Sequence, residues 1–195
     1  MRRRETKNLE FSTAHTVWDR RWTTAVGRAD WTEPEPEVRA VVELLHARGG
    51  QVVLDLGCGV GRHAQLFARS GFETVAIDAS YSGLVFGRDQ VKDGQEPLWI
   101  QGDFTELPFT AGVFDLVLAW NVIYHGDQRI VRQALREMAR TLKPRGLLLL
   151  TILSKRNALY GQGQEVSEDT FVDDTDDEEK CHPHYMGSPQ GQVLN

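Results

Sequence analysis

Cysteine and long hydrophobic runs are both scarce in this chain of 195 residues. Its two cysteines, Cys58 and Cys181, lie far apart, which is not the disulfide framework of a small secreted domain, so we expect a reducing, cytoplasmic compartment. The longest apolar run, at 147–153, is much shorter than the ~20 residues that a membrane helix needs. No hydrophobic stretch follows the basic first residues, so we expect neither a signal peptide nor a membrane partner.

An excess of basic charge is also missing. The formal net charge is −6, and residues 157–195 hold nine of the 28 acidic side chains but only one of the 22 basic ones. The remainder of the chain is close to neutral. Nucleic-acid binding needs a concentrated basic face, so we expect no nucleic-acid partner. We predict that residues 157–195 form an acidic, poorly ordered tail.

What the sequence does contain is an alternation of strand-like and helix-like segments. Short apolar runs predict strands at 52–56, 74–77, 98–100, 114–119 and 146–153. Helical patterns precede the first strand and separate most of the others, and Asp127 is the expected N-cap of the last helix. The alternation predicts an α/β fold over residues 36–156, with a doubly wound, mostly parallel sheet covered by helices on both faces.

The first 35 residues are rich in large aromatic side chains. Trp18, Trp22 and Trp31 all precede the first predicted strand, and three large rings are too many for a solvent-exposed leader. We expect residues 1–35 to form a cap segment, with Trp18 against a bound ligand. Packing against the sheet edge or the following helix is the alternative.

The most informative motif is a glycine-rich turn between a buried strand and a helix. Gly57, Gly59 and Gly61 allow the backbone to approach a ligand closely. The dinucleotide spacing G-x-G-x-x-G fails, because Arg62 stands where the third glycine should be. Asp55, just before the turn, would repel a pyrophosphate and suits a cation such as an ammonium group. A nicotinamide-dependent oxidoreductase is therefore disfavoured.

Two further carboxylates follow the next two predicted strands. Asp78, with Ala79 after it, can accept hydrogen bonds from both hydroxyls of a ribose, although it could instead cap the next helix. Asp103 could accept from an adenine amino group, and Phe104 offers a backbone N–H and an apolar wall. The alternative for Asp103 is an ordinary turn. The correct order of the three signals on successive strands strengthens all of them.

These motifs together resemble the class I S-adenosylmethionine-dependent methyltransferases. The similarity covers residues 50–153 and is greatest to the small-molecule branch that contains the methyltransferase-domain and tellurite-resistance-type enzymes. Matching segments are Asp55–Arg62, Ala76–Asp78, Gly102–Asp103, Leu107–Phe109, Phe114–Val117 and Leu142–Gly146.

The resemblance implies a cofactor, S-adenosyl-L-methionine, and a small-molecule methyl acceptor. The methionine part of the cofactor would lie on the turn that includes Cys58. The ribose would lie beside Asp78, and the adenine beside Asp103 and Phe104. Residues just past the fourth strand would face cofactor and acceptor. Of these, Asn121 is expected at the cofactor, and His125 and Tyr124 are the candidate catalytic residues.

The resemblance also predicts a seven-stranded sheet, of which only five strands are evident. We interpret the chain as a C-terminally truncated methyltransferase, and a non-catalytic cofactor-binding or regulatory variant is the alternative. Cys181, His182 and His184 suggest a metal site, but their spacing matches no usual zinc pattern, so no metal is predicted. Cys58, between two glycines, is expected to be a small packing residue rather than a nucleophile.

Overall fold

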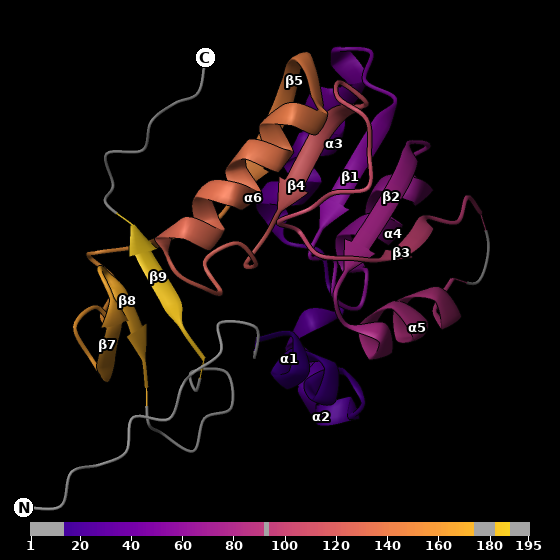
Figure 1. The fold of residues 1–195 in the computed structure, drawn as a ribbon. Helices are drawn as coiled ribbons and strands as arrows, with labels where there is room; N and C mark the ends of the chain where they lie inside the picture. Colours follow the sequence, from indigo (N-terminus) through magenta and orange to yellow (C-terminus); the bar gives the residue numbers. More distant parts are fainter. Residues whose placement is uncertain (1–13, 92–93, 174–181, 188–195) are drawn as a thin grey trace, which may run out of the picture.

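The computed structural model describes residues 14–91, 94–173 and 182–187 and confirms the predicted α/β architecture (Figure 1). No helix in the described part of the chain is both long and apolar enough to cross a membrane. The elements in chain order are α1 (Ala14–Trp22), α2 (Ala25–Arg28), a 3₁₀ helix (Ala29–Trp31), α3 (Pro36–Ala47), β1 (Val52–Leu56), α4 (Arg62–Arg69), β2 (Glu73–Asp78), α5 (Tyr81–Asp89), β3 (Leu98–Gln101), β4 (Phe114–Ala119), α6 (Gln128–Thr141), β5 (Leu142–Leu150), β6 (Leu153–Ser154), β7 (Gln164–Ser167), β8 (Thr170–Val172) and β9 (His184–Gly187).

The central sheet has the strand order β3-β2-β1-β4-β5, and every neighbouring pair is parallel. The order reverses between β1 and β4, which is the point where open α/β sheets bind ligands beyond the carboxyl ends of their strands. Both strands are almost completely buried. That burial explains why their sequences are continuous apolar runs instead of alternating patterns.

Alternate residues of each strand divide the core between the two faces of the sheet. Val53 and Leu116 pack with Val38 of α3 and Phe67 of α4. Their neighbours Leu54 and Val117 pack instead with α6, and α5 joins α4 over β2. Figure 1 shows α1 and α2 beyond the carboxyl ends of β1 and β2, on neither face of the sheet. The cap is therefore placed over the edge where a ligand would bind.

The fifth strand differs from its prediction at both ends. We predicted a strand over 146–153, whereas β5 already begins at Leu142 and ends at Leu150. Its pairing with β4 shifts register between Phe114 and Leu116, and Arg145 has a φ of 65°. The strand thus contains an irregularity near its start, and Leu153 belongs to a separate sheet.

That second sheet contradicts the prediction of a poorly ordered tail over 157–195. In the described part of that segment, β7, β8 and β9 join β6 in the order β6-β9-β8-β7. The sequence shows little core periodicity there because the strands are only three or four residues long. Their apolar side chains, such as Phe171 and Met186, are nevertheless buried. The acidic run itself falls largely outside the described residues.

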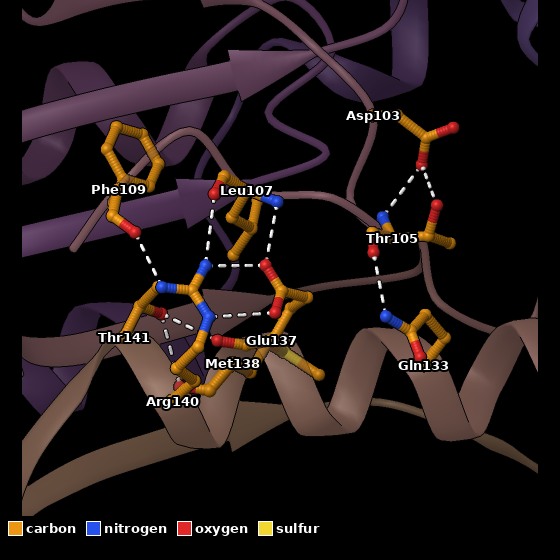
Figure 2. Close-up of polar contacts among 9 residues, drawn as sticks. All are labelled: Asp103, Thr105, Leu107, Phe109, Gln133, Glu137, Met138, Arg140 and Thr141. Carbon is orange, nitrogen blue, oxygen red and sulfur yellow. Dashed lines mark hydrogen bonds and ion pairs between the residues drawn. The ribbon is translucent and has the colours of Figure 1, made fainter. Parts of the chain in front are cut away.

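The loop between β3 and β4 is attached to α6 by hydrogen bonds to Arg140, Glu137 and Gln133. Arg140 donates to the carbonyl oxygens of Phe109 (2.6 Å) and Leu107 (3.0 Å) and to both carboxylate oxygens of Glu137 (Figure 2). Glu137 also accepts from the backbone N–H of Leu107 at 2.9 Å. The Arg140 guanidinium holds the pKa of Glu137 below its usual range. This contact fixes the loop that begins beside Phe104.

Replacing Arg140 by alanine should destabilise the fold measurably. The substitution removes the donor to the carbonyl oxygens of Leu107 and Phe109 and leaves the Glu137 carboxylate with the N–H of Leu107. We expect a lower free energy of unfolding, measured by urea denaturation. Arg136→Ala, at an exposed arginine of the same helix, should change stability by less than about 0.5 kcal/mol. Equal effects of the two variants would contradict the assignment.

Candidate functional site

A cavity lies at the carboxyl ends of β1, β2 and β4, beneath the N-terminal cap. Eight of the predicted cofactor-binding residues line it: Trp18, Gly57, Cys58, Gly59, Asp78, Ala79, Phe104 and Asn121. His125 lines it too, whereas Asp55, Gly61, Asp103 and Tyr124 are not among its lining residues. The turn, the end of β2 and the segment after β4 therefore do converge, as their order along the chain predicts.

The glycine-rich turn leaves no room for a side chain at its glycine positions. Gly57 has a φ of 68°, and a Cβ built on it would lie 2.1 Å from the side chain of Val122. At Gly61, φ is 78° and a Cβ would lie 2.3 Å from the ring of Trp99. Gly61 is therefore required for packing the start of α4, whereas Gly57 and Gly59 form a backbone wall of the cavity.

Asp78 holds this turn through its carboxylate. One oxygen accepts from the N–H of Gly59 and the other from the N–H of Ser80, both at 2.7 Å. The N-cap of α5 is Ser80, whose hydroxyl accepts from Gly83, so Asp78 is not the helix cap. Burial raises the pKa of Asp78, and these backbone hydrogen bonds oppose the rise. The carboxylate retains lone pairs for further donors.

Asp55 is buried behind the turn instead of facing the cavity. Its side chain is 1% exposed, and Oδ2 has no hydrogen-bond partner among the described residues. Burial raises its pKa to about 7, and the charge of Asp78 adds to the rise, while a hydrogen bond from the Ala64 backbone and the charge of Arg62 oppose it. A cation on the other side of the turn would therefore interact with Asp55 through the intervening backbone.

The two residues predicted to contact adenine are placed differently. Phe104 lines the cavity beside Gly102. Asp103 is exposed, and one of its carboxylate oxygens accepts from both the N–H and the hydroxyl of Thr105 at 2.7 Å (Figure 2). That arrangement is the ordinary turn considered as its alternative. A contact between Asp103 and a ligand stays a prediction.

Three tryptophans of the cap form one aromatic cluster at the cavity. The ring of Trp18 lies 5.0 Å from that of Trp22 and 5.2 Å from that of Trp31, centre to centre. All three line the cavity, and Trp22 is 5% exposed. A Cβ on Gly59 would lie 3.1 Å from the Trp22 ring, so the cluster closes directly over the turn.

One anchor of the cap is Asp19, whose importance was not predicted from the sequence. Its Oδ1 accepts from the hydroxyl of Ser80 and from the N–H of Ser82, both at 2.8 Å. Partial burial alone would raise the pKa of Asp19, but these hydrogen bonds lower it on balance. The sequence around Asp19 does not indicate this role, because the residues that Asp19 binds lie about 60 residues further along the chain.

The second anchor joins the cap to the start of α4. Arg62 forms an ion pair with Glu35 at 3.0 Å and donates to the carbonyl oxygen of Glu33 at 3.1 Å. His63 accepts from the N–H of Glu35 at 3.2 Å, and burial lowers its pKa to about 3. Arg62 thus has a structural role in addition to breaking the dinucleotide motif.

The segment after β4 forms the far wall. Asn121 has a φ of 58° and is held by Thr151, which accepts from its N–H at 2.6 Å and donates to its side chain at 3.0 Å. Tyr124 lines a second cavity that shares Trp18, Trp31 and His125 with the first. The two cavities therefore adjoin across these three side chains.

Both ring nitrogens of His125 have neighbours. Nε2 lies 3.1 Å from the carbonyl oxygen of Asn121, and Nδ1 lies 2.8 Å from Nε2 of His182. Burial lowers the pKa of His125 well below its usual range and that of His182 to about 3; the adjacent imidazoles add to both shifts. This arrangement does not favour His125 as a general base, and its catalytic role stays a prediction.

Comparisons with known proteins agree with this geometry. Residues 53–146 match the family described as "Methyltransferase domain". The ubiquinone/menaquinone biosynthesis C-methyltransferase UbiE of Azotobacter vinelandii is 36% identical over 144 residues, covering 69% of this chain and 55% of that protein. The demethylmenaquinone methyltransferase of Paenarthrobacter aurescens is 36% identical over 118 residues, covering 60% of this chain and 44% of that one. The chain spans about half the length of the curated relatives it matches.

Solved structures show the same fold. The PH0226 protein of Pyrococcus horikoshii OT3 is 28% identical, with a TM-score of 0.58, and the match covers 78% of this chain and 77% of that one. Magnesium protoporphyrin IX methyltransferase from Synechocystis PCC 6803, solved with bound SAH, has a TM-score of 0.56 at 24% identity, covering 76% and 70% of the two chains. The second likeness concerns the fold alone.

The buried carboxyl group of Asp55 predicts an unusual pH dependence of stability. Because its folded pKa of about 7 is above the value in the unfolded chain, its contribution is fully present below about pH 4 and declines as the pH rises to about 7. Asp55→Asn removes the cost of ionisation. Its stability relative to the unaltered chain should therefore rise by about 2–3 kcal/mol between about pH 5 and pH 8.

Urea denaturation at the two pH values checks this expectation. Asp89→Asn, at an exposed carboxylate at the end of α5, is the matched control and should show no such rise. A constant difference between Asp55→Asn and the unaltered chain would mean that Asp55 is already ionised at low pH in the folded protein.

Proposed function

We propose that this chain, which belongs to the class I S-adenosylmethionine-dependent methyltransferases, transfers a methyl group from S-adenosylmethionine to a small-molecule acceptor. The observation that carries the proposal is the cavity formed at the strand-order reversal by the glycine-rich turn and the carboxylate of Asp78. Glycine N–H groups and one carboxylate at that place suit a nucleoside with an attached amino acid.

The residues of the cavity fit the cofactor part by part. Asp78 already fixes the turn with one hydrogen bond to each oxygen, and its remaining lone pairs can accept from the ribose hydroxyls. Phe104 and Ile77 supply apolar surface for the adenine. The backbone wall of Gly57 and Gly59 would hold the methionine part, where a side chain would obstruct it.

Asp55 favours the positively charged end of the cofactor. Its unpartnered oxygen lies behind the turn in a site where ionisation is costly, as its raised pKa shows. An ammonium group across the turn would stabilise the ionised carboxylate, since an opposite charge within a few ångströms favours the charged form. Asp55 would therefore favour a cation, as predicted, although it does not line the cavity.

The second cavity is the proposed acceptor site. It adjoins the first across Trp18, Trp31 and His125, and Tyr124 and Phe171 are among its other lining residues. Aromatic walls with a few polar groups are typical of sites for small organic ligands. The quinone-pathway names of two relatives favour an aromatic acceptor. Exclusion of nucleic acid and membrane partners, and a cytoplasmic location, remain predictions from composition.

The chain's own contribution to the reaction would be positioning. S-adenosylmethionine supplies a methyl group already activated by its sulfonium, so the protein has to align the two reactants and exclude water. The tryptophan cluster covers the cavity, and its anchors Asp19 and Arg62 hold it there. Both candidate catalytic residues line the proposed acceptor site, and Tyr124 is the better placed because both ring nitrogens of His125 already have neighbours.

Removing the Asp78 carboxylate should weaken cofactor binding. Asp78→Ala leaves the N–H groups of Gly59 and Ser80 without acceptors and the ribose hydroxyls without a partner. We expect a loss of about 1–3 kcal/mol, or roughly 5- to 150-fold in Kd, for S-adenosylmethionine and S-adenosylhomocysteine by isothermal titration calorimetry. Asp89→Ala, at the exposed carboxylate on α5, should bind both normally.

The same titrations test the whole assignment. Nicotinamide dinucleotides should not bind, and tight binding of NAD without a response to either sulfur nucleoside would overturn the cofactor. Release of S-adenosylhomocysteine in the presence of quinol, carboxylate and amine acceptors then tests turnover. Cofactor binding with no turnover on any of them would favour the non-catalytic alternative.

The tryptophan fluorescence of the cap should change when the cofactor binds. Trp22→Phe reduces the ring area over Gly59, so we expect an affinity loss of about 0.5–1.5 kcal/mol and a smaller change in tryptophan fluorescence on titration. Trp18→Phe should act in the same direction. Trp99 does not line the cavity, so Trp99→Phe should keep most of the fluorescence change. If all three variants respond alike, the cap only packs against the domain.

A further inference from the structure

Three histidines from two distant segments meet between the two cavities. We propose that His125, His182 and His184 form a binding site for a divalent transition-metal ion, with zinc as the expected occupant. One ring nitrogen from each lies within 4.8 Å of the others. His125 comes from the segment after β4, whereas the other two belong to the second sheet and the residues leading into it.

The state of His182 is the second observation that points to a ligand. Its side chain is completely buried, and its Nε2 faces the Nδ1 of His125 at 2.8 Å. The ring of His184 lies 4.4 Å from that of His182 and 5.0 Å from that of His125, centre to centre. Three imidazoles crowded in this way are an expensive way to fill a core, because Nδ1 of His182 also has no hydrogen-bond partner among the described residues. A cation between the facing nitrogens would use their lone pairs and would leave Nδ1 of His182 on the other side of its ring.

His125 already has the orientation of a metal ligand. Its Nε2 lies 3.1 Å from the carbonyl oxygen of Asn121, to which it can donate, and this fixes the tautomer that leaves Nδ1 free to coordinate. Ligating histidines nearly always donate their other ring nitrogen to a carbonyl or carboxylate in this way. Coordination through Nδ1 would also exclude a general-base role for His125.

Backbone pairing holds the two segments together independently of any ion. His125 and His184 form an isolated antiparallel bridge, and the N–H of Tyr185 donates to the carbonyl oxygen of Tyr124 at 2.9 Å. The hydroxyl of Tyr185 accepts from the side chain of Gln128 at 3.1 Å. The three rings are thus delivered to one place by the fold, which makes a site that needs little rearrangement.

The distances require the cluster to adjust in both directions. Two nitrogens that each lie about 2.0–2.1 Å from a tetrahedral zinc are roughly 3.3 Å apart. His125 and His182 would separate by about half an ångström from their present 2.8 Å, whereas nitrogens up to 4.8 Å apart would approach by up to about 1.5 Å. Three protein ligands leave a fourth position for water or another ligand, and His125 and His184 border the proposed acceptor cavity.

Ligand chemistry selects the class of ion. Imidazole nitrogens suit zinc, copper, nickel and cobalt, whereas magnesium and calcium prefer oxygen ligands. The sequence motif around His182 and His184 indicated no metal because the third ligand lies 57 residues before His182. The three histidines come together only when the chain folds, so the spacing of His182 and His184 alone does not reveal the site.

Metal binding can be measured on the tag-free, metal-free chain with Zn²⁺ and Co²⁺ as probes. We expect one ion per chain by calorimetry, a tetrahedral visible spectrum with Co²⁺, and no binding of Mg²⁺ or Ca²⁺. Saturating Zn²⁺ should raise Tm by roughly 5 °C. His125→Gln and His184→Gln should each weaken Zn²⁺ binding by more than about 100-fold, beyond the typical cost of losing an outer-shell partner.

His46→Gln is the matched control, since His46 is an exposed histidine on α3 that stacks on Phe72; it should keep full affinity. Because His182 is fully buried, its replacement also disturbs packing, and the Co²⁺ spectrum of the unaltered chain tests the site without any substitution. No saturable Zn²⁺ binding, equal affinity in all variants, or an octahedral Co²⁺ spectrum would overturn the proposal. A thiolate-to-cobalt band would overturn the three-histidine ligand set. None of these readouts depends on methyl transfer.

Discussion

The turn after β1 runs so close to Val122 and Trp99 that side chains are excluded at Gly57 and Gly61. Its path is fixed from the other side by the Asp78 carboxylate, which accepts the N–H of Gly59. The neighbouring elements are arranged around this backbone: the cap covers it, α4 begins from it, and the segment after β4 packs against it. The cavity lies beside this tightly packed backbone, with Gly57 and Gly59 among its lining residues.

Two kinds of contact together fix the position of the N-terminal cap: packing of its tryptophan rings and a few polar contacts. Its tryptophans supply apolar area but little direction, since rings 5.0–5.7 Å apart can pack in many ways. Direction comes from two polar anchors, Asp19 on the start of α5 and Arg62 with His63 on residues 33–35. Both anchors attach the cap to helix starts that frame the turn, so the cap and the turn are positioned by the same elements.

Much of the central domain was predictable because its signals are local. Continuous apolar runs marked the buried strands, and Asp127 caps α6 as expected, accepting from the N–H of Ile130. The second sheet was not predictable, since three short strands give too few residues for a period to emerge. Asp55 is buried and does not line the cavity, because sequence spacing does not say which side of a turn a side chain occupies; its preference for a cation stays a prediction. The histidine cluster depends on a contact over 57 residues, for which one sequence holds no signal.

The pairing of β9 with β6 and with the segment around Tyr124 sets the order in which the molecule can assemble. β1 pairs with β4 across about 60 residues, and β9 returns over some 30 residues to reach β6 and about 60 to reach His125. Closing long loops is entropically costly and is compensated only when the distant contacts form. The buried ladder between β1 and β4 offers more compensation than the short ladder between β6 and β9. The central sheet should therefore fold first, and the wall between the two cavities should be the last part of the site to appear. A population of molecules caught with that wall open would have a formed glycine turn but no boundary on the acceptor side.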